Sequence, residues 1–108
     1  MELKHDYWQG QFEDILGTFI KSISQYSINH NGIKIGITND PEKRLKEHIA
    51  SNVGWKKMII KYETTSINYI NVMEELLINY HWEILSNIRG NVGETNKTPP
   101  YYLYIVIK

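Results

Sequence analysis

The chain has 108 residues, of which 42% are hydrophobic and 22% are charged, and it contains no cysteine. These values are typical of a single globular domain, and they exclude a disordered chain, a disulfide framework and a thiolate metal site. The formal net charge is zero. This balance argues against tight, non-specific binding of nucleic acid, because such binding depends on neutralising phosphates.

The N-terminal residues do not follow the pattern of a signal peptide, and no apolar run approaches the length of a membrane span. We therefore expect a cytoplasmic protein that does not enter membranes. No repeat or linker divides the chain, so we expect one domain over residues 1–108.

The first predicted element is an amphipathic helix over residues 7–25, with Asp6 as its candidate N-cap. Its apolar residues recur at helical spacing: Phe12, Ile15, Leu16, Phe19, Ile20 and Ile23. The dipeptide Asn31-Gly32 then predicts a turn.

The segment 33–38 alternates in the manner of a strand, with Ile33, Ile35 and Ile37 on one face. Gly36 within this strand indicates that another group approaches the backbone closely. Asp40 and Pro41 are typical of an N-cap and a first helical residue. The helix that follows is expected to turn Leu45 and Ile49 inward and to end before Gly54.

The second half of the chain predicts two further strands with a helix between them. Residues 57–64 predict a strand, and Thr65 or Ser66 would cap a helix that runs to about Leu85. A polar loop over residues 86–100 leads to a last strand over 101–107. The predicted fold class is α+β, with a small three-stranded antiparallel or mixed sheet flanked by three helices.

Arg44 and His48 lie four residues apart, so they are neighbours on one face of their helix. Basic residues gather in this part of the chain: Lys43, Arg44, Lys46, Lys56, Lys57 and Lys61. An arginine and a histidine presented together suit the binding of a phosphate. From this local pattern alone, an ordinary solvated helix is the better interpretation.

Three motifs together favour a functional interpretation over a solvated helix. Residues 34–48, from Lys34-Ile35-Gly36 to Arg44 and His48, resemble the second core strand and the arginine-bearing helix of the GIY-YIG nuclease superfamily. Residues 73–78 are similar to the helix that carries the metal-binding glutamate of this family, and residues 87–90 to its asparagine and glycine loop. Each motif is short, and their order and spacing carry the resemblance.

The chain departs from the family at its first strand, since nothing before Ile33 resembles the Gly-Ile-Tyr segment. The resemblance therefore implies that the last strand, with Tyr102 and Tyr104, takes this place beside residues 33–38, as in a circular permutation. Residues 33–108 would form the core, and the helix over 7–25 would be an addition that could support a homodimer.

The resemblance implies a metal-dependent endonuclease that hydrolyses DNA phosphodiester bonds with Mg²⁺ or Mn²⁺. Arg44 would hold phosphate oxygens, Glu74 would bind the metal ion, and Tyr104 or Tyr102 would orient or deprotonate the attacking water. The other expected contributors are His48 and Lys34 in catalysis and Asn87, Thr38 and Lys43 in substrate binding.

Each of these residues also has a structural interpretation, for example a strand tyrosine or a helix-capping asparagine. The main alternative is a catalytically inactive module on the same scaffold that binds nucleic acid, a nucleotide or a protein partner. The substituted motif tyrosine, the displaced first strand and the zero net charge motivate it. A purely structural or protein-interaction domain is a third interpretation.

Overall fold

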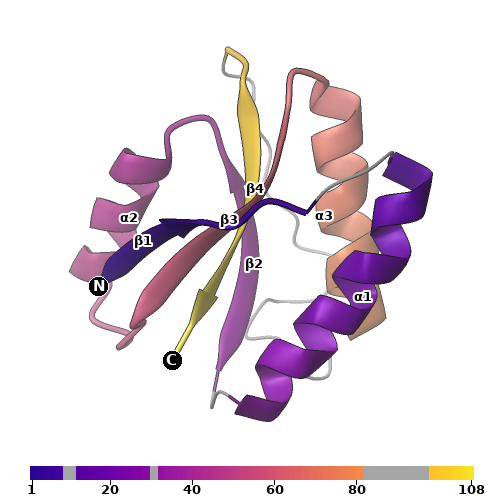
Figure 1. Cartoon of the computed structure of the whole chain (residues 1–108). Coiled ribbons are helices and arrows are strands. Elements are labelled where there is room, and N and C mark those ends of the chain that lie inside the picture. Colours follow the sequence, from indigo (N-terminus) through magenta and orange to yellow (C-terminus); the bar gives the residue numbers. More distant parts are fainter. Residues whose placement is uncertain (9–11, 30–31, 82–97) are drawn as a thin grey trace.

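The computed structural model describes residues 1–8, 12–29, 32–81 and 98–108. Within these ranges, three helices cover a mixed sheet of four strands in the order β1-β3-β4-β2 (Figure 1). The elements are β1 (Glu2–His5), α1 (Phe12–Asn29), β2 (Ile33–Thr38), α2 (Pro41–Ala50), β3 (Lys57–Thr64), α3 (Ile67–His81) and β4 (Tyr101–Ile107). The predicted α+β class is confirmed, whereas the prediction of three strands is wrong.

The additional strand is β1, which pairs in parallel with β3 and places Leu3 opposite Met58. The amides of Asp6 and Trp8 extend this pairing by donating to the carbonyls of Ile60 and Lys61, at 3.0 and 2.8 Å. Residues 2–8 are thus held along β3 by their backbone. The predicted start of the first helix at residue 7 is therefore wrong, as is the assignment of Asp6 as its N-cap.

β4 lies between β2 and β3 and is antiparallel to both. Its register with β2 places Tyr104 opposite Gly36 and Tyr102 opposite Thr38. The expectation that the last strand is an antiparallel neighbour of residues 33–38 is confirmed. Whether this arrangement reflects a circular permutation stays a prediction.

The two faces of the sheet differ in what covers them. α1 and α3 cover one face and enclose the larger apolar core (Figure 1). This core contains alternate residues of the strands together with residues of both helices: Ile33, Ile35, Ile37, Ile59, Leu103, Ile105, Ile107, Phe19, Ile23, Ile70, Met73, Leu77 and Ile78. Burial of so many aliphatic side chains is the main stabilising contribution to the fold.

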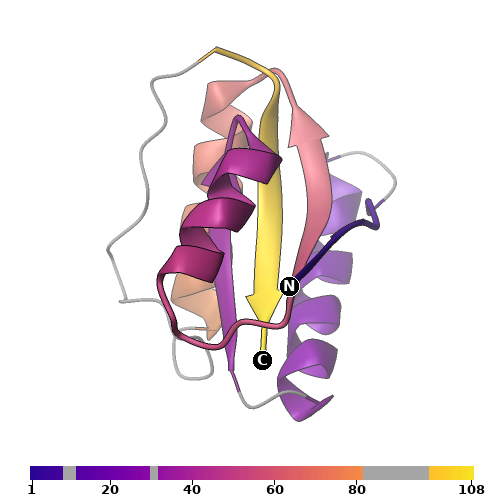
Figure 2. The same cartoon turned by 90° about the vertical axis from the view of Figure 1, so that its left-hand side faces the viewer.

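α2 covers the opposite face and lies in front of the sheet in Figure 2. Its smaller core consists of Trp55, Met58, Ile60, Tyr104 and Val106. No residue of α2 itself is fully buried. Leu45 packs against this cluster as predicted, but Ile49 is 53% exposed, so its predicted inward packing is wrong.

In the described part of the chain, none of the helices has both the length and the apolar character that crossing a membrane requires.

The start of α3 settles which residue caps it. Ser66 Oγ accepts the amide hydrogen of Tyr69 at 3.2 Å, the geometry of an N-cap. We expect Ser66→Ala to lower the free energy of unfolding by about 1 kcal/mol, because alanine cannot accept this bond. Urea denaturation measures the change, with the exposed neighbour Thr65→Ala as the control. A larger loss for Thr65→Ala than for Ser66→Ala would contradict the assignment.

Candidate active site

The site is built around Tyr104, a β4 residue that faces α2 and is only 1% exposed. Its phenol lies across the backbone of Gly36 on the adjacent strand. A Cβ atom at position 36 would lie 2.3 Å from both Cζ and Oη of Tyr104, far inside contact distance. The close approach indicated by a glycine within a strand is therefore that of the tyrosine ring.

α2 brings two side chains to this phenol. Arg44 Nη1 donates to Tyr104 Oη at 3.1 Å, and His48 Nε2 lies 2.9 Å from the same oxygen. The helix is fixed at its start by Asp40, whose Oδ1 accepts the amide hydrogen of Lys43 at 3.1 Å. The predicted neighbours Arg44 and His48 thus meet one group, which comes from a strand 60 residues further along the chain.

The donors and acceptors of this trio determine its protonation. A guanidinium can only donate, so Tyr104 Oη accepts from Arg44 and keeps its own hydrogen for another acceptor. His48 Nε2 can be that acceptor when the ring is neutral. A protonated ring would offer only a donor, leaving a buried hydroxyl hydrogen without an acceptor here, so the hydrogen-bond chain favours a neutral His48.

The electrostatics agree with this assignment. Burial lowers the pKa of His48 below its usual 6.5, and the positive charges of Lys34 and Arg44 lower it further, while Glu47 opposes them. Burial raises the pKa of Tyr104 above its usual 10.0 against the opposing effect of Arg44. Near neutral pH the pair therefore consists of an un-ionised phenol and a neutral imidazole that accepts its hydrogen bond.

Two further predicted residues lie within electrostatic reach of this trio. Lys34, on β2, acts on the pKa of His48, and Glu74, on α3, raises the pKa of Tyr104. Glu74 is 3% exposed, which is rare for a carboxylate and costs free energy unless the charge is compensated. Lys34 thus acts on the trio from β2 by its charge, and Glu74 acts on it by charge from α3, which covers the face of the sheet opposite to α2 (Figure 1).

The guanidinium has further donor capacity. Arg44 Nε is buried and donates no hydrogen bond to any described residue, and it lies 3.6 Å from Glu47 Oε2, beyond hydrogen-bond distance. The arginine side chain is 34% exposed, so it can be reached from solvent. Guanidinium hydrogens other than the buried Nε hydrogen can therefore donate to an anionic oxygen brought to this face.

Tyr102 and Tyr104 lie on the same face of β4, so strand alternation alone does not distinguish them, but their positions in the structure differ. Tyr102 faces the same side as Tyr104 but lies opposite Thr38 and Glu63, where burial and the Glu63 charge raise its pKa. Its hydroxyl makes no described hydrogen bond with Arg44 or His48, whose partner is Tyr104.

The three predicted substrate-binding residues have different positions. Thr38 is buried, and its Oγ1 both donates to the Asp40 carbonyl and accepts from the Asp40 amide, at 3.1 and 3.0 Å, so it shapes the turn. Lys43 is exposed on the first turn of α2. Asn87 lies outside the described residues.

Two contributors escape prediction from the sequence. Glu47, whose charge raises the pKa values of both His48 and Tyr104, appears in the sequence only as one of two acids in a helix with three Lys or Arg residues. The Tyr104 ring packs across the backbone of Gly36 because of the register between β2 and β4, and the sequence alone does not provide this register.

The donor set is compatible with a hard divalent ion held by few protein ligands. Among the described residues there is no group of three or more His, Asp or Glu side chains that could hold a metal ion. Glu74 supplies one carboxylate, and Mg²⁺ commonly binds through one or two carboxylates plus water and substrate oxygens. Because Glu74 is 3% exposed, a hydrated ion reaches its carboxylate only if the surrounding side chains move apart.

Comparison with models of known protein families finds no match for this chain, and comparisons with curated proteins and with solved structures find none either.

The fit between Gly36 and Tyr104 can be tested by substitution. We expect Gly36→Ala to lower the free energy of unfolding by about 1–3 kcal/mol, because the added methyl group overlaps the phenol. The penalty should shrink when Tyr104→Ala is also present, a coupling that chemical denaturation of the four proteins measures. Gly17→Ala is the matched control: no atom lies within 4 Å of its Cβ, and helix propensity should raise stability by about 0.5–1 kcal/mol. Equal penalties for Gly36→Ala in both backgrounds would contradict the fit.

The charge environment of His48 can be tested by titration. We expect its NMR midpoint to lie below 6.5 and to rise in Lys34→Met, because removing a positive charge favours the protonated ring. Lys46→Met, which changes an exposed lysine on the same helix, should leave the midpoint in place. Because the folded state binds this proton less tightly than the unfolded state, the His48 contribution to stability is complete above pH 6.5 and is lost as pH falls toward the folded-state pKa. An unshifted midpoint would refute the buried, positively charged environment.

Proposed function

We propose that this protein is a metal-dependent endonuclease that hydrolyses DNA phosphodiester bonds. The observation that carries the proposal is the contact of Arg44 and His48 with the hydroxyl of Tyr104, within electrostatic reach of the buried Glu74. The resemblance of residues 34–48, 73–78 and 87–90 to GIY-YIG nucleases supports the same reaction, with DNA as the substrate.

The geometry suits proton transfer during the attack of water on phosphorus. His48 is neutral and hydrogen-bonded to Tyr104, so it can take the phenolic proton while the phenol oxygen takes one proton from the attacking water, and this relay forms no separate phenolate. Arg44 stabilises the negative charge that develops on the phenol oxygen through the bond that it already donates. The hydroxide forms a bond to phosphorus as the bond to the leaving oxygen breaks.

Arg44 and Lys34 would carry the positive charge that the transition state requires. The exposed part of the Arg44 guanidinium can bind a non-bridging phosphate oxygen, whose charge increases as water attacks. Lys34 adds a second positive charge on the neighbouring strand, as its effect on His48 indicates.

Glu74 would hold the divalent ion, which when bound would neutralise the leaving oxygen and polarise the phosphate.

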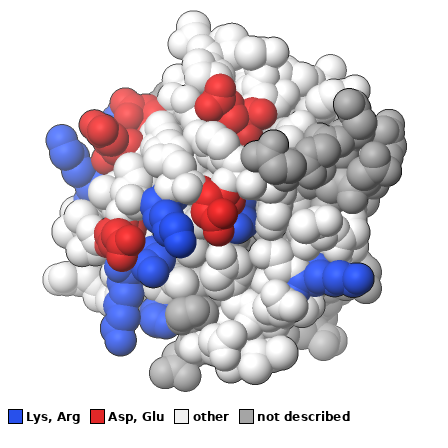
Figure 3. Space-filling model, viewed as in Figure 1, with Lys and Arg blue, Asp and Glu red and all other residues white. Residues whose placement is uncertain are grey.

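A catalytically inactive binding module is the second candidate, and a specific observation favours it. Tyr104 is 1% exposed, and its hydroxyl already engages two side chains, so water reaches it only if these groups move apart. The charge distribution also departs from that of a strongly basic nucleic-acid interface, since Figure 3 shows Lys, Arg, Asp and Glu side chains interspersed on the face in view. Such a module would bind nucleic acid, a nucleotide or a protein partner without turnover, and its possible dimerisation through α1 also remains a proposal.

Cleavage of DNA distinguishes the two candidates. We expect the purified protein to cut a mixture of branched, nicked and linear duplexes in Mg²⁺ or Mn²⁺, and to stop when the metal is chelated. Arg44→Ala, Glu74→Gln and Tyr104→Phe should each reduce the cleavage rate about a hundredfold or more, because each removes a charge or a proton-transfer group at phosphorus.

The chain provides a nearby residue as a matched control for each change: Lys46→Ala, Glu75→Gln and Tyr102→Phe, which should cut at close to the rate of the unmodified protein. Thermal unfolding of all six variants separates loss of chemistry from loss of fold. DNA binding without a metal-dependent product, unchanged in Glu74→Gln, would establish the binding module instead.

A further inference from the structure

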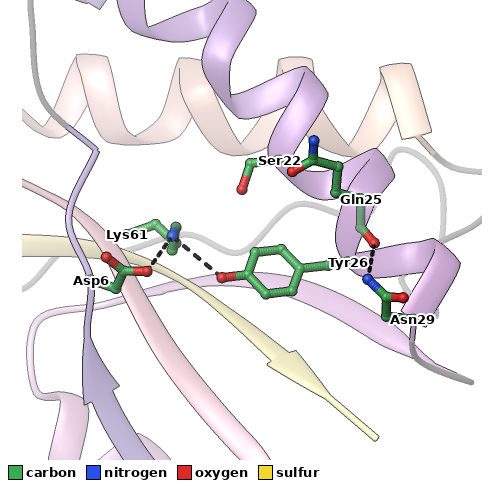
Figure 4. Close-up of a pocket in the computed structure, with 6 residues that line it drawn as sticks. All are labelled: Asp6, Ser22, Gln25, Tyr26, Asn29 and Lys61. Carbon is green, nitrogen blue, oxygen red and sulfur yellow. Dashed lines mark hydrogen bonds and ion pairs between the residues drawn. The ribbon is translucent and has the colours of Figure 1, made fainter.

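A polar cavity lies on the α1 face of the sheet, between α1 and the β1–β3 edge. It has a volume of about 350 Å³ and is lined by Asp6, Ser22, Gln25, Tyr26, Asn29 and Lys61 (Figure 4). This size lies at the lower end of the range for small-molecule pockets. Since α2 and Tyr104 lie across the sheet, the cavity is separate from the candidate active site.

A β-bulge directs a lysine into this cavity. β3 and β4 pair regularly up to Ile60 and Tyr104, but the next pair is Tyr62 with Leu103, so Lys61 is the extra residue. Lys61 and Tyr62 therefore both face α1, although consecutive strand residues normally alternate. Bulges re-aim side chains in this way next to functional sites.

The lysine is buried, and its counter-ion is accessible. Lys61 is 4% exposed, yet its Nζ faces the cavity and lies 3.3 Å from Oδ2 of Asp6 and 3.5 Å from the hydroxyl of Tyr26 (Figure 4). The Asp6 side chain is 53% exposed and lies just beyond the end of β1. A buried ammonium needs a negative partner, whereas an exposed carboxylate loses little when it turns into water.

The wall formed by α1 is polar. Ser22, Gln25, Tyr26 and Asn29 follow the i, i+3, i+4, i+7 spacing, which places them along one stripe of the helix. Their hydroxyl and amide groups can both donate and accept hydrogen bonds. Lys61 Nζ also lies 4.8 Å from the ring centre of Trp8 and 5.5 Å from that of Tyr26, contacts that hold the ammonium at the base of the cavity.

We propose that this cavity binds a small anion bearing a carboxylate or phosphate group. The anionic group replaces the Asp6 carboxylate on Lys61, and the polar remainder of the ligand lies along the α1 stripe. Asp6 then acts as an internal competitor, so its removal strengthens binding, whereas removal of Lys61 weakens it.

Titration of the ¹⁵N-labelled protein with inorganic phosphate, and separately with succinate, at constant ionic strength tests this proposal. We expect saturable shifts of the backbone amides of residues 22–29 and 61. Lys61→Met should weaken binding about tenfold or more, because a charge-assisted hydrogen bond is lost. Asp6→Asn should bind more tightly than the unmodified protein, and Asp6→Ser serves the same purpose if the asparagine variant does not fold. Lys21→Met, an exposed lysine of α1 outside the cavity lining, should bind normally.

The proposal predicts opposite changes in anion affinity for the two partners of one ion pair: weaker binding without Lys61 and tighter binding without Asp6. A merely structural ion pair would give no saturable shift at these amides for either anion, and that result overturns the proposal. Equal affinity in the Lys61→Met and unmodified proteins, or weaker binding in Asp6→Asn and Asp6→Ser, overturns it as well. None of these outcomes depends on nuclease activity.

Discussion

The hydroxyl group of Tyr104 joins α2 to the sheet, and the candidate site depends on this joint. α2 buries none of its residues completely, so its attachment relies on Leu45 and on the bonds of Arg44 and His48 to the phenol. Gly36 makes the arrangement possible because any side chain there would overlap the ring. The side chains that attach α2 to the sheet are therefore the same side chains that could transfer a proton. A substitution in this trio should affect both the stability of α2 and any reaction at the site.

The sheet separates two polar sites that are built differently. On the α2 face, strand alternation alone brings Lys34 and Tyr104 toward the helix, opposite the apolar residues that enter the larger core. On the α1 face, alternation is interrupted, and the extra residue of the bulge points a lysine into what would otherwise be an apolar layer. Lys34, Lys61 and Tyr104 are held by strands that also pack the core, whereas Asp6 lies beyond the end of β1 with its side chain 53% exposed.

Much of this arrangement follows from sequence patterns that are local. Alternation predicts β2 and its faces, Asp40 and Pro41 predict the start of α2, and spacing places Arg44 beside His48. What escapes prediction depends on distant partners. β1 is a four-residue strand with no buried side chain, so only its pairing with β3 identifies it. Tyr102 and Tyr104 lie two residues apart on the same face of β4. Only the strand register, which places Tyr104 opposite Gly36, shows which of them meets Arg44 and His48. Asn87 lies outside the described residues, so its role stays a prediction.

The order of the strands has a consequence for biosynthesis. β4 is the last described strand to leave the ribosome, yet it lies between β2 and β3, which do not pair with each other. A nascent chain that ends before β4 can join β1 to β3 but cannot assemble the rest of the sheet, and the phenol that anchors α2 is not yet present. Folding therefore awaits the completion of residues 101–107, and such an incomplete chain exposes the apolar faces of β2 and β3 to chaperones and proteases.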